Sequence, residues 1–263
     1  MTCTLRVLGC SGGISTDLRT TSLLLNENIL IDAGTGVGDL SLDELRKIDH
    51  VFLTHSHLDH ICSIPLIADA VGGSRDKPLK VYGIYKTIHA LQEHIFNNVI
   101  WPDFTKIPSA KNPFISLHLI EIDEPFKMDG ISITALPVDH SIAANAYAVD
   151  SGSGTLVFSG DTGVSDDLWK AINQQKQIKH IIIETSFSDQ EEALAIVSGH
   201  LSPSLLIKEL DKLDSKACDT SLQVWVCHLK PDGGDAIMHE IANLSESHKI
   251  KPQKLARNTL LQF

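Results

Sequence analysis

Three imidazoles and one carboxylate lie within six residues of this chain, in the string from His55 to His60 (His-Ser-His-Leu-Asp-His). The string follows the short apolar run 51–53, which ends a predicted strand over residues 48–53. Imidazole and carboxylate are ligands that suit zinc and similar divalent ions. The His-x-His pair can hold one ion and Asp59-His60 can face a second, about 3.5–4 Å away, as in two-metal hydrolytic sites. The alternative is a polar loop in which some of the 13 histidines cluster by chance, but the full string is too rich in ligands for packing to explain.

Length and composition favour one domain over residues 1–263, because 43% hydrophobic content is ample for a buried core. No run approaches the 18 apolar residues of a membrane span. The start of the chain lacks the charged leader of a signal peptide, and the five cysteines show no paired spacing, so we expect reduced thiols in the cytoplasm.

The net charge of −11 disfavours a nucleic-acid partner, whereas bound metal ions would still allow a small anionic substrate.

The remaining periodicity predicts a mixed sheet structure with helices outside, which is a layered α/β sandwich. Strands are expected over residues 5–8, 21–25, 29–32, 79–82, 116–122, 131–138, 145–149, 155–158, 180–183, 222–227 and 259–263. Helices are expected over residues 61–71, 86–98, 166–175, 203–213 and 234–247. Residues 101–113 contain three prolines and no clear period, which predicts an irregular pocket wall or partner contact.

Further titratable groups follow other predicted strands or precede a helix. They are His140, Asp161, Glu184, His200 and His228. Each has a plain alternative: Asp161 in Gly-Asp-Thr-Gly suits an ordinary turn, His228 suits a hydrogen-bonded core histidine, and His200 suits a helix N-terminus. Active sites of layered α/β proteins collect at one edge of a sheet, so the recurrence of polar residues at several strand ends favours a functional site.

The ordered set of ligand-type residues resembles the metallo-β-lactamase superfamily over essentially the whole chain, with Asp32-Ala33-Gly34 upstream. The resemblance implies a four-layer αβ/βα sandwich with two divalent ions between the sheets: Zn²⁺, with Mn²⁺ or Fe²⁺ as alternatives. Carried over by position, His55, His57 and His140 would bind the first ion, Asp59, His60 and His228 the second, and Asp161 both. Asp32 would orient the histidine loop.

Three local strings, which are Leu8 to Gly13, His55 to Ser63 and Gly199 to Pro203, are similar to those of class II 3′,5′-cyclic-nucleotide phosphodiesterases. The nearest rival is the tRNA 3′-processing endonuclease group, whose Glu-Ala-Thr-Phe motif resembles Glu184 to Phe187. Ester and thioester hydrolases of the superfamily share the metal ligands, and a metal-binding or cyclic-nucleotide-sensing module without turnover is a non-enzymatic alternative.

The resemblance implies hydrolysis of cyclic AMP or cyclic GMP to the 5′-nucleoside monophosphate by a hydroxide held between the two metals. His200 would protonate the leaving oxygen and Glu184 would hold the charged imidazole, while Asp59 counts as both ligand and catalytic residue. It also implies a homodimer formed through a helical or irregular insertion at about residues 65–113. The residue that stacks on the base stays open, and the candidates are Tyr82, Tyr85, Phe96, Trp101, Phe104 and Phe187.

Overall fold

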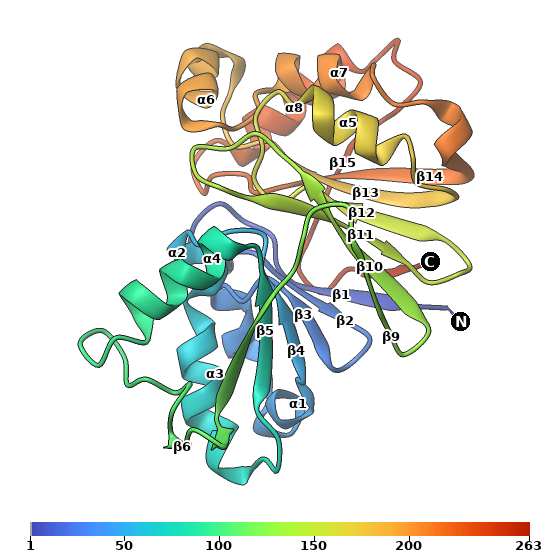
Figure 1. Cartoon of the computed structure of the whole chain (residues 1–263). Helices are drawn as coiled ribbons and strands as arrows, with labels where there is room; N and C mark the ends of the chain where they lie inside the picture. Colours follow the sequence, from blue (N-terminus) through green and yellow to red (C-terminus); the bar gives the residue numbers. More distant parts are fainter. Residues whose placement is uncertain (1) are drawn as a thin grey trace.

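Two seven-stranded sheets pack face to face in the computed structural model, which describes residues 2–263 (Figure 1). The first sheet has the order β16 (Leu260–Gln262), β1 (Thr4–Gly9), β2 (Ser22–Leu25), β3 (Ile29–Ile31), β4 (His50–Phe52), β5 (Leu79–Gly83) and β8 (Ile115–Leu119). The second has the order β15 (Gln253–Lys254), β14 (Cys218–Cys227), β13 (Ile178–Glu184), β12 (Thr155–Phe158), β11 (Asn145–Asp150), β10 (Ile131–Pro137) and β9 (Pro125–Met128). The strands from β3 to β8 in the first sheet and from β12 to β15 in the second run parallel.

Helices cover the outer face of each sheet (Figure 1). The first half carries α1 (Leu42–Lys47), α2 (Leu58–Ile61), α3 (Ser63–Val71) and α4 (Tyr85–Ala90). The second half carries α5 (Asp166–Ile172), α6 (Glu192–Ser198), α7 (Pro203–Leu210) and α8 (Gly234–Leu244). No helix among residues 2–263 is long and apolar enough to cross a membrane.

Three apolar cores separate the four layers, and the strand sequences explain why. In β4, Val51 packs under the helices of the first half, whereas its neighbour Phe52 packs between the two sheets. In β13, Ile181 and Ile183 face the helices of the second half, and Ile182 faces the other sheet. Successive side chains of a strand point to opposite faces, so strands buried on both faces are apolar throughout. The predicted four-layer αβ/βα sandwich is confirmed.

Several elements differ from the expectations. Helix α1 was not predicted, although Ser41 and Glu44 form a capping box at its start, a pattern visible in the sequence. The short strands β9 and β15 and helix α6 were also missed. The helix expected over 86–98 is shorter, because α4 continues only as one π turn over Leu91–Ile95. Beyond this turn, the Asn97 side chain accepts hydrogen bonds from the backbone amides of Val99 and Ile100.

The stretch 65–113, expected to be an insertion, contains β5, which pairs with β4 and β8 inside the first sheet. The part that projects is therefore α4 and the connection after it (Figure 1). Within the segment expected to be irregular, β6 (Pro108–Ser109) and β7 (Asn112–Pro113) form a small hairpin.

Candidate metal centre

The histidine loop follows β4, and hydrogen bonds to Asp32, a buried residue that follows β3, hold it in place. One carboxylate oxygen of Asp32 accepts from the Thr54 amide at 2.8 Å. The other accepts from the Thr54 hydroxyl and from Nδ1 of His60, both at 2.8 Å. Asp32 thus ties the beginning of the loop to helix α2, which begins at Leu58 and carries Asp59 and His60.

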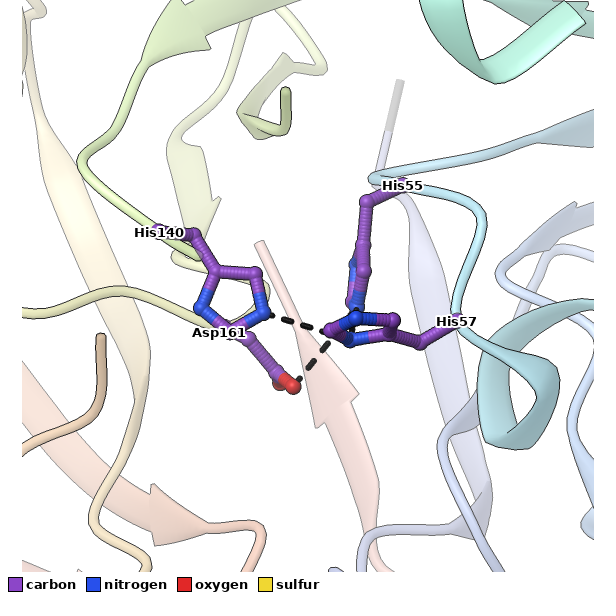
Figure 2. A group of neighbouring side chains, drawn as sticks. All are labelled: His55, His57, His140 and Asp161. Atoms are coloured by element: carbon purple, nitrogen blue, oxygen red, sulfur yellow. Dashed lines mark hydrogen bonds and ion pairs between the residues drawn. The ribbon is translucent and has the colours of Figure 1, made fainter. Parts of the chain in front are cut away.

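A first group of possible ligands consists of His55, His57, His140 and Asp161, whose ligand atoms all lie within 4.8 Å of one another. Figure 2 shows the four side chains pointing toward a common centre. Nδ1 of His57 lies 3.0 Å from Nε2 of His55 and 3.3 Å from Nε2 of His140. A zinc ion with bonds of 2.0–2.1 Å places tetrahedral ligands about 3.4 Å apart, so these spacings suit one ion.

A second group consists of Asp59, His60 and His228. Oδ2 of Asp59 lies 3.3 Å from Nε2 of His228 and 3.6 Å from Nε2 of His60. Asp161 reaches both groups: one carboxylate oxygen lies 3.5 Å from Nε2 of His60, and the other lies 3.3 Å from His228 and 3.7 Å from His55. The structure therefore brings together all seven side chains for which the sequence predicts a ligand role, with Asp161 between the two groups.

Four of the five histidines use their remaining ring nitrogen in a hydrogen bond that leaves the lone pair of the other nitrogen facing the centre. The partners are Asp32 for His60, the carbonyl oxygen of Gly199 for His140, the hydroxyl of Ser186 for His228 and the hydroxyl of Thr54 for His55, at 2.8–2.9 Å. Such partners fix the ring tautomer of metal-binding histidines. Nε2 of His60 is buried with no hydrogen-bond partner among the described residues, so a metal ion fits the polar atoms that this centre presents.

The protonation states also suit metal binding. Burial lowers the pKa of His55 well below its usual value, and the neighbouring His60 adds to this effect, so His55 is neutral. Burial opposes ionisation of Asp161, but His228 and His60 hold its pKa well below the usual range. Burial also opposes the charge on His60, yet Asp161 and Asp32 raise its pKa well above the usual value. A metal ion at His60 would therefore compete with a proton.

Glu184 and His200 form a buried pair beside the second group. Nδ1 of His200 donates to Glu184 at 2.6 Å, and the Thr162 amide donates to the same carboxylate oxygen at 3.2 Å. Burial lowers the pKa of His200, but the hydrogen bond and charge of Glu184 outweigh this and raise it. His200 also joins Asp161 and His228 in a group whose ligand atoms lie within 4.8 Å of one another. The pair thus places a charge-stabilised imidazole at the edge of the centre.

The sequence prediction missed Ser186, Gly12 and Gly199. Ser186 donates to Glu184 at 3.0 Å and accepts from His228 at 2.8 Å, so one hydroxyl links the acid pair to a possible ligand. A Cβ on Gly12 would lie 2.5 Å from the carbonyl oxygen of His228, so only glycine allows this approach. Gly199 has φ +71° and presents the carbonyl oxygen that orients His140. All three residues lie in strings that resemble family motifs, Leu8 to Gly13, Glu184 to Phe187 and Gly199 to Pro203, but the strings alone do not indicate these contacts.

Comparison with known sequences identifies one family. The profile of the class-II cAMP phosphodiesterases matches residues 43–252. A probable 3′,5′-cyclic-nucleotide phosphodiesterase from Yersinia pestis is 26% identical over 207 residues, which span 71% of this chain and 58% of that protein. A 3′,5′-cyclic-nucleotide phosphodiesterase from Aliivibrio fischeri is 25% identical over 85% of this chain and 80% of that protein. A ribonuclease Z from Clostridium acetobutylicum is 33% identical, but over 54% of this chain and 48% of that protein.

Comparison with solved structures identifies the fold. Unliganded yeast PDE1 matches with a TM-score of 0.82 at 21% identity, over 100% of this chain and 99% of that one. The metallo-β-lactamase fold protein YhfI from Bacillus subtilis matches with a TM-score of 0.77 at 19% identity, over the same shares of the two chains. The chain therefore has the metallo-β-lactamase fold, as its sequence pattern predicts.

Replacing Asp32 by asparagine tests whether Asp32 orients His60 for metal binding. Asp32→Asn has one acceptor oxygen where the carboxylate uses two, so the new NH2 group faces either the Thr54 amide or Nδ1 of His60, and the link that orients His60 is weakened. We expect zinc affinity to fall about 10–100-fold, the usual effect of removing a hydrogen-bond partner of a ligand. Competition with a chromophoric chelator measures it. Asp139→Asn is the control, because Asp139 is exposed and precedes His140 without belonging to either group; equal losses in both variants would refute the role of Asp32.

Proposed function

Because the chain belongs to the family of class-II cAMP phosphodiesterases, we propose that it hydrolyses 3′,5′-cyclic nucleotides, cyclic AMP or cyclic GMP, to 5′-nucleoside monophosphates. The observation that carries the proposal is the buried Glu184–His200 pair at the edge of the two ligand groups. A thioester releases a thiolate, which needs no proton, whereas a phosphodiester with an alkoxide leaving group needs an acid. The chain spans 58% of the length of the Yersinia relative.

Two divalent ions would be held by His55, His57 and His140 on one side and by Asp59, His60 and His228 on the other, with Asp161 shared. Zn²⁺ suits these ligands, and Mn²⁺ or Fe²⁺ binds similar sets. When bound, such a pair supplies a water of lowered pKa and neutralises charge on the phosphate oxygens. Asp161 is buried, and its lowered pKa keeps it ionised, as a metal ligand must be. Asp59 is partly exposed, with 34% of its side chain accessible.

His200 would donate the proton that the leaving group requires. In this step a water oxygen forms a bond to phosphorus, the bond between phosphorus and the 3′ oxygen breaks, and the 3′ oxygen takes a proton from His200. Nδ1 of His200 is occupied by Glu184, which leaves Nε2 as the donor. Asp59 is the partly exposed carboxylate that would accept the proton released by water. A positioned acid of this kind contributes about 10²–10⁴-fold in rate.

A tRNA 3′-processing endonuclease is the second candidate, favoured by the similarity to the Clostridium ribonuclease Z. The net charge of −11 stands against it, since binding an RNA backbone depends on a basic surface. Turnover of cyclic AMP, cyclic GMP and a precursor tRNA, measured side by side with the zinc-loaded protein, separates the two. We expect hydrolysis of at least one cyclic nucleotide and none of the tRNA, and the reverse pattern would replace the proposal.

A His200→Ala variant tests the acid role. It should retain its zinc, because His200 is outside the proposed ligand set, and it should lose about 10²–10⁴-fold in kcat on cyclic AMP. On bis-p-nitrophenyl phosphate, whose leaving group needs no proton, the variant should lose far less. Steady-state kinetics on both substrates, together with metal analysis, makes the comparison. Equal losses on the two substrates would remove His200 from the acid role.

A further inference from the structure

Several aromatic side chains that the sequence offers for base stacking are enclosed by the protein. Tyr82 is buried between the sheets, where its ring stacks on Phe52 at 4.6 Å between centroids. Phe96 and Phe104 are buried in the core between the first sheet and its helices, and Trp101 packs against the same core. Three candidates stay at least partly accessible: Tyr85, which is 61% exposed on α4, and the half-buried Trp101 and Phe187.

Phe187 lies at the end of a row of rings that begins at the proposed metal ligands. The ring centroids of His60 and His228 are 5.7 Å apart, those of His228 and His200 are 5.4 Å apart, and those of His200 and Phe187 are 5.7 Å apart. The row therefore runs from ligand to proton donor to aromatic ring. A cyclic nucleotide with its phosphorus at the ligands and its 3′ oxygen at His200 would extend its nucleoside toward Phe187.

A cavity of about 250 Å³ opens beside Phe187 and is also lined by Gln190, Lys230, Asp232 and Glu240. Nζ of Lys230 lies 5.7 Å from the centroid of the Phe187 ring and donates to the carbonyl oxygen of Gly12 at 3.4 Å. Within residues 2–263, no carboxylate lies within 4.0 Å of this ammonium group, so its charge is available to an anionic ligand. The acidic and amide side chains of the wall offer acceptors for an amino group.

We propose that the cavity beside Phe187 is the nucleobase subsite, in which a purine with an exocyclic amino group stacks on Phe187. This inference rests on the proposed function and adds the part of the substrate that the metal centre does not contact. Base stacking on an aromatic ring contributes about 1–3 kcal/mol. The cavity on the other side of His200 is lined by Asp139, Ser141 and the aliphatic residues Val164, Ile196 and Val197, and its only rings are the imidazoles of His140 and His200, so it offers a base no phenyl or indole ring for stacking.

Calorimetric titration of the zinc-loaded protein with AMP and with ribose 5-phosphate tests the subsite, because the two ligands share the phosphate and differ in the base. Wild-type protein should bind AMP more tightly than ribose 5-phosphate. Phe187→Leu keeps the apolar contacts and removes the aromatic face, and it should raise the Kd of AMP at least about fivefold. The same variant should leave the Kd of ribose 5-phosphate within about twofold. Tyr85→Leu is the matched control and should leave both constants unchanged.

Three results would overturn the subsite. They are equal affinity of the wild type for the two ligands, equal weakening of both in Phe187→Leu, and loss of AMP affinity in Tyr85→Leu alone. Turnover separates this inference from the proposed function. If the wild type fails to hydrolyse cyclic nucleotides but binds AMP through Phe187, the proposed function fails and the nucleotide subsite stands.

Discussion

Nδ1 of His57 lies 3.0 Å from Nε2 of His55 and 3.3 Å from Nε2 of His140, and this close approach of three imidazole nitrogens is the constraint on which the rest of the structure depends. Such an arrangement is unfavourable unless a cation or a proton lies between the nitrogens. Buried groups of this kind are retained where their other atoms are fully hydrogen-bonded and the centre is filled. Four of the five histidines meet the first condition, through Asp32, Thr54, Ser186 and the Gly199 carbonyl. The proposed metal pair meets the second.

The two halves of the sandwich contribute unequal parts of the centre. The loop from His55 to His60 comes from the first half, at the end of β4, whereas His140, Asp161 and His228 come from loops of the second half. Two bound ions would therefore tie one half to the other through Asp161. Binding energy of this kind is also folding energy, since a ligand that binds only the folded chain stabilises it. The same edge carries the Glu184–His200 pair, which places the proposed proton donor on the half that holds Asp161.

How much the sequence predicts depends on how local each signal is. The histidine string was recognisable because its ligands are neighbours in the chain, and His140, Asp161 and His228 because each follows a strand. The role of Ser186 depends on contacts with residues up to 42 positions away, which no local pattern records. Gly12 is similar, because its close approach to His228 exists only after folding. Helix α1 was overlooked despite its capping box, since a six-residue helix shows too little periodicity beside the stronger strand signals.

The residue that stacks on the base also cannot be chosen from local sequence patterns. Six aromatic residues were equivalent in the sequence, and burial alone sets Tyr82, Phe96 and Phe104 aside. The order of rings from His60 to Phe187 then distinguishes Phe187 from Tyr85 and from Trp101, whose ring packs against Phe104. The position of the proposed base subsite therefore depends on the folded arrangement of these rings, whereas four of the seven proposed metal ligands are neighbours in the sequence.

The number of zinc ions bound per chain tests the central claim most directly. Calorimetric titration of chelator-treated wild-type protein with Zn²⁺ counts them without reference to any substrate. A centre in which Asp161 serves two groups of ligands predicts saturation at two ions per chain, with release of protons as His60 exchanges a proton for metal. Saturation at one ion, or no binding, would contradict the two-ion centre.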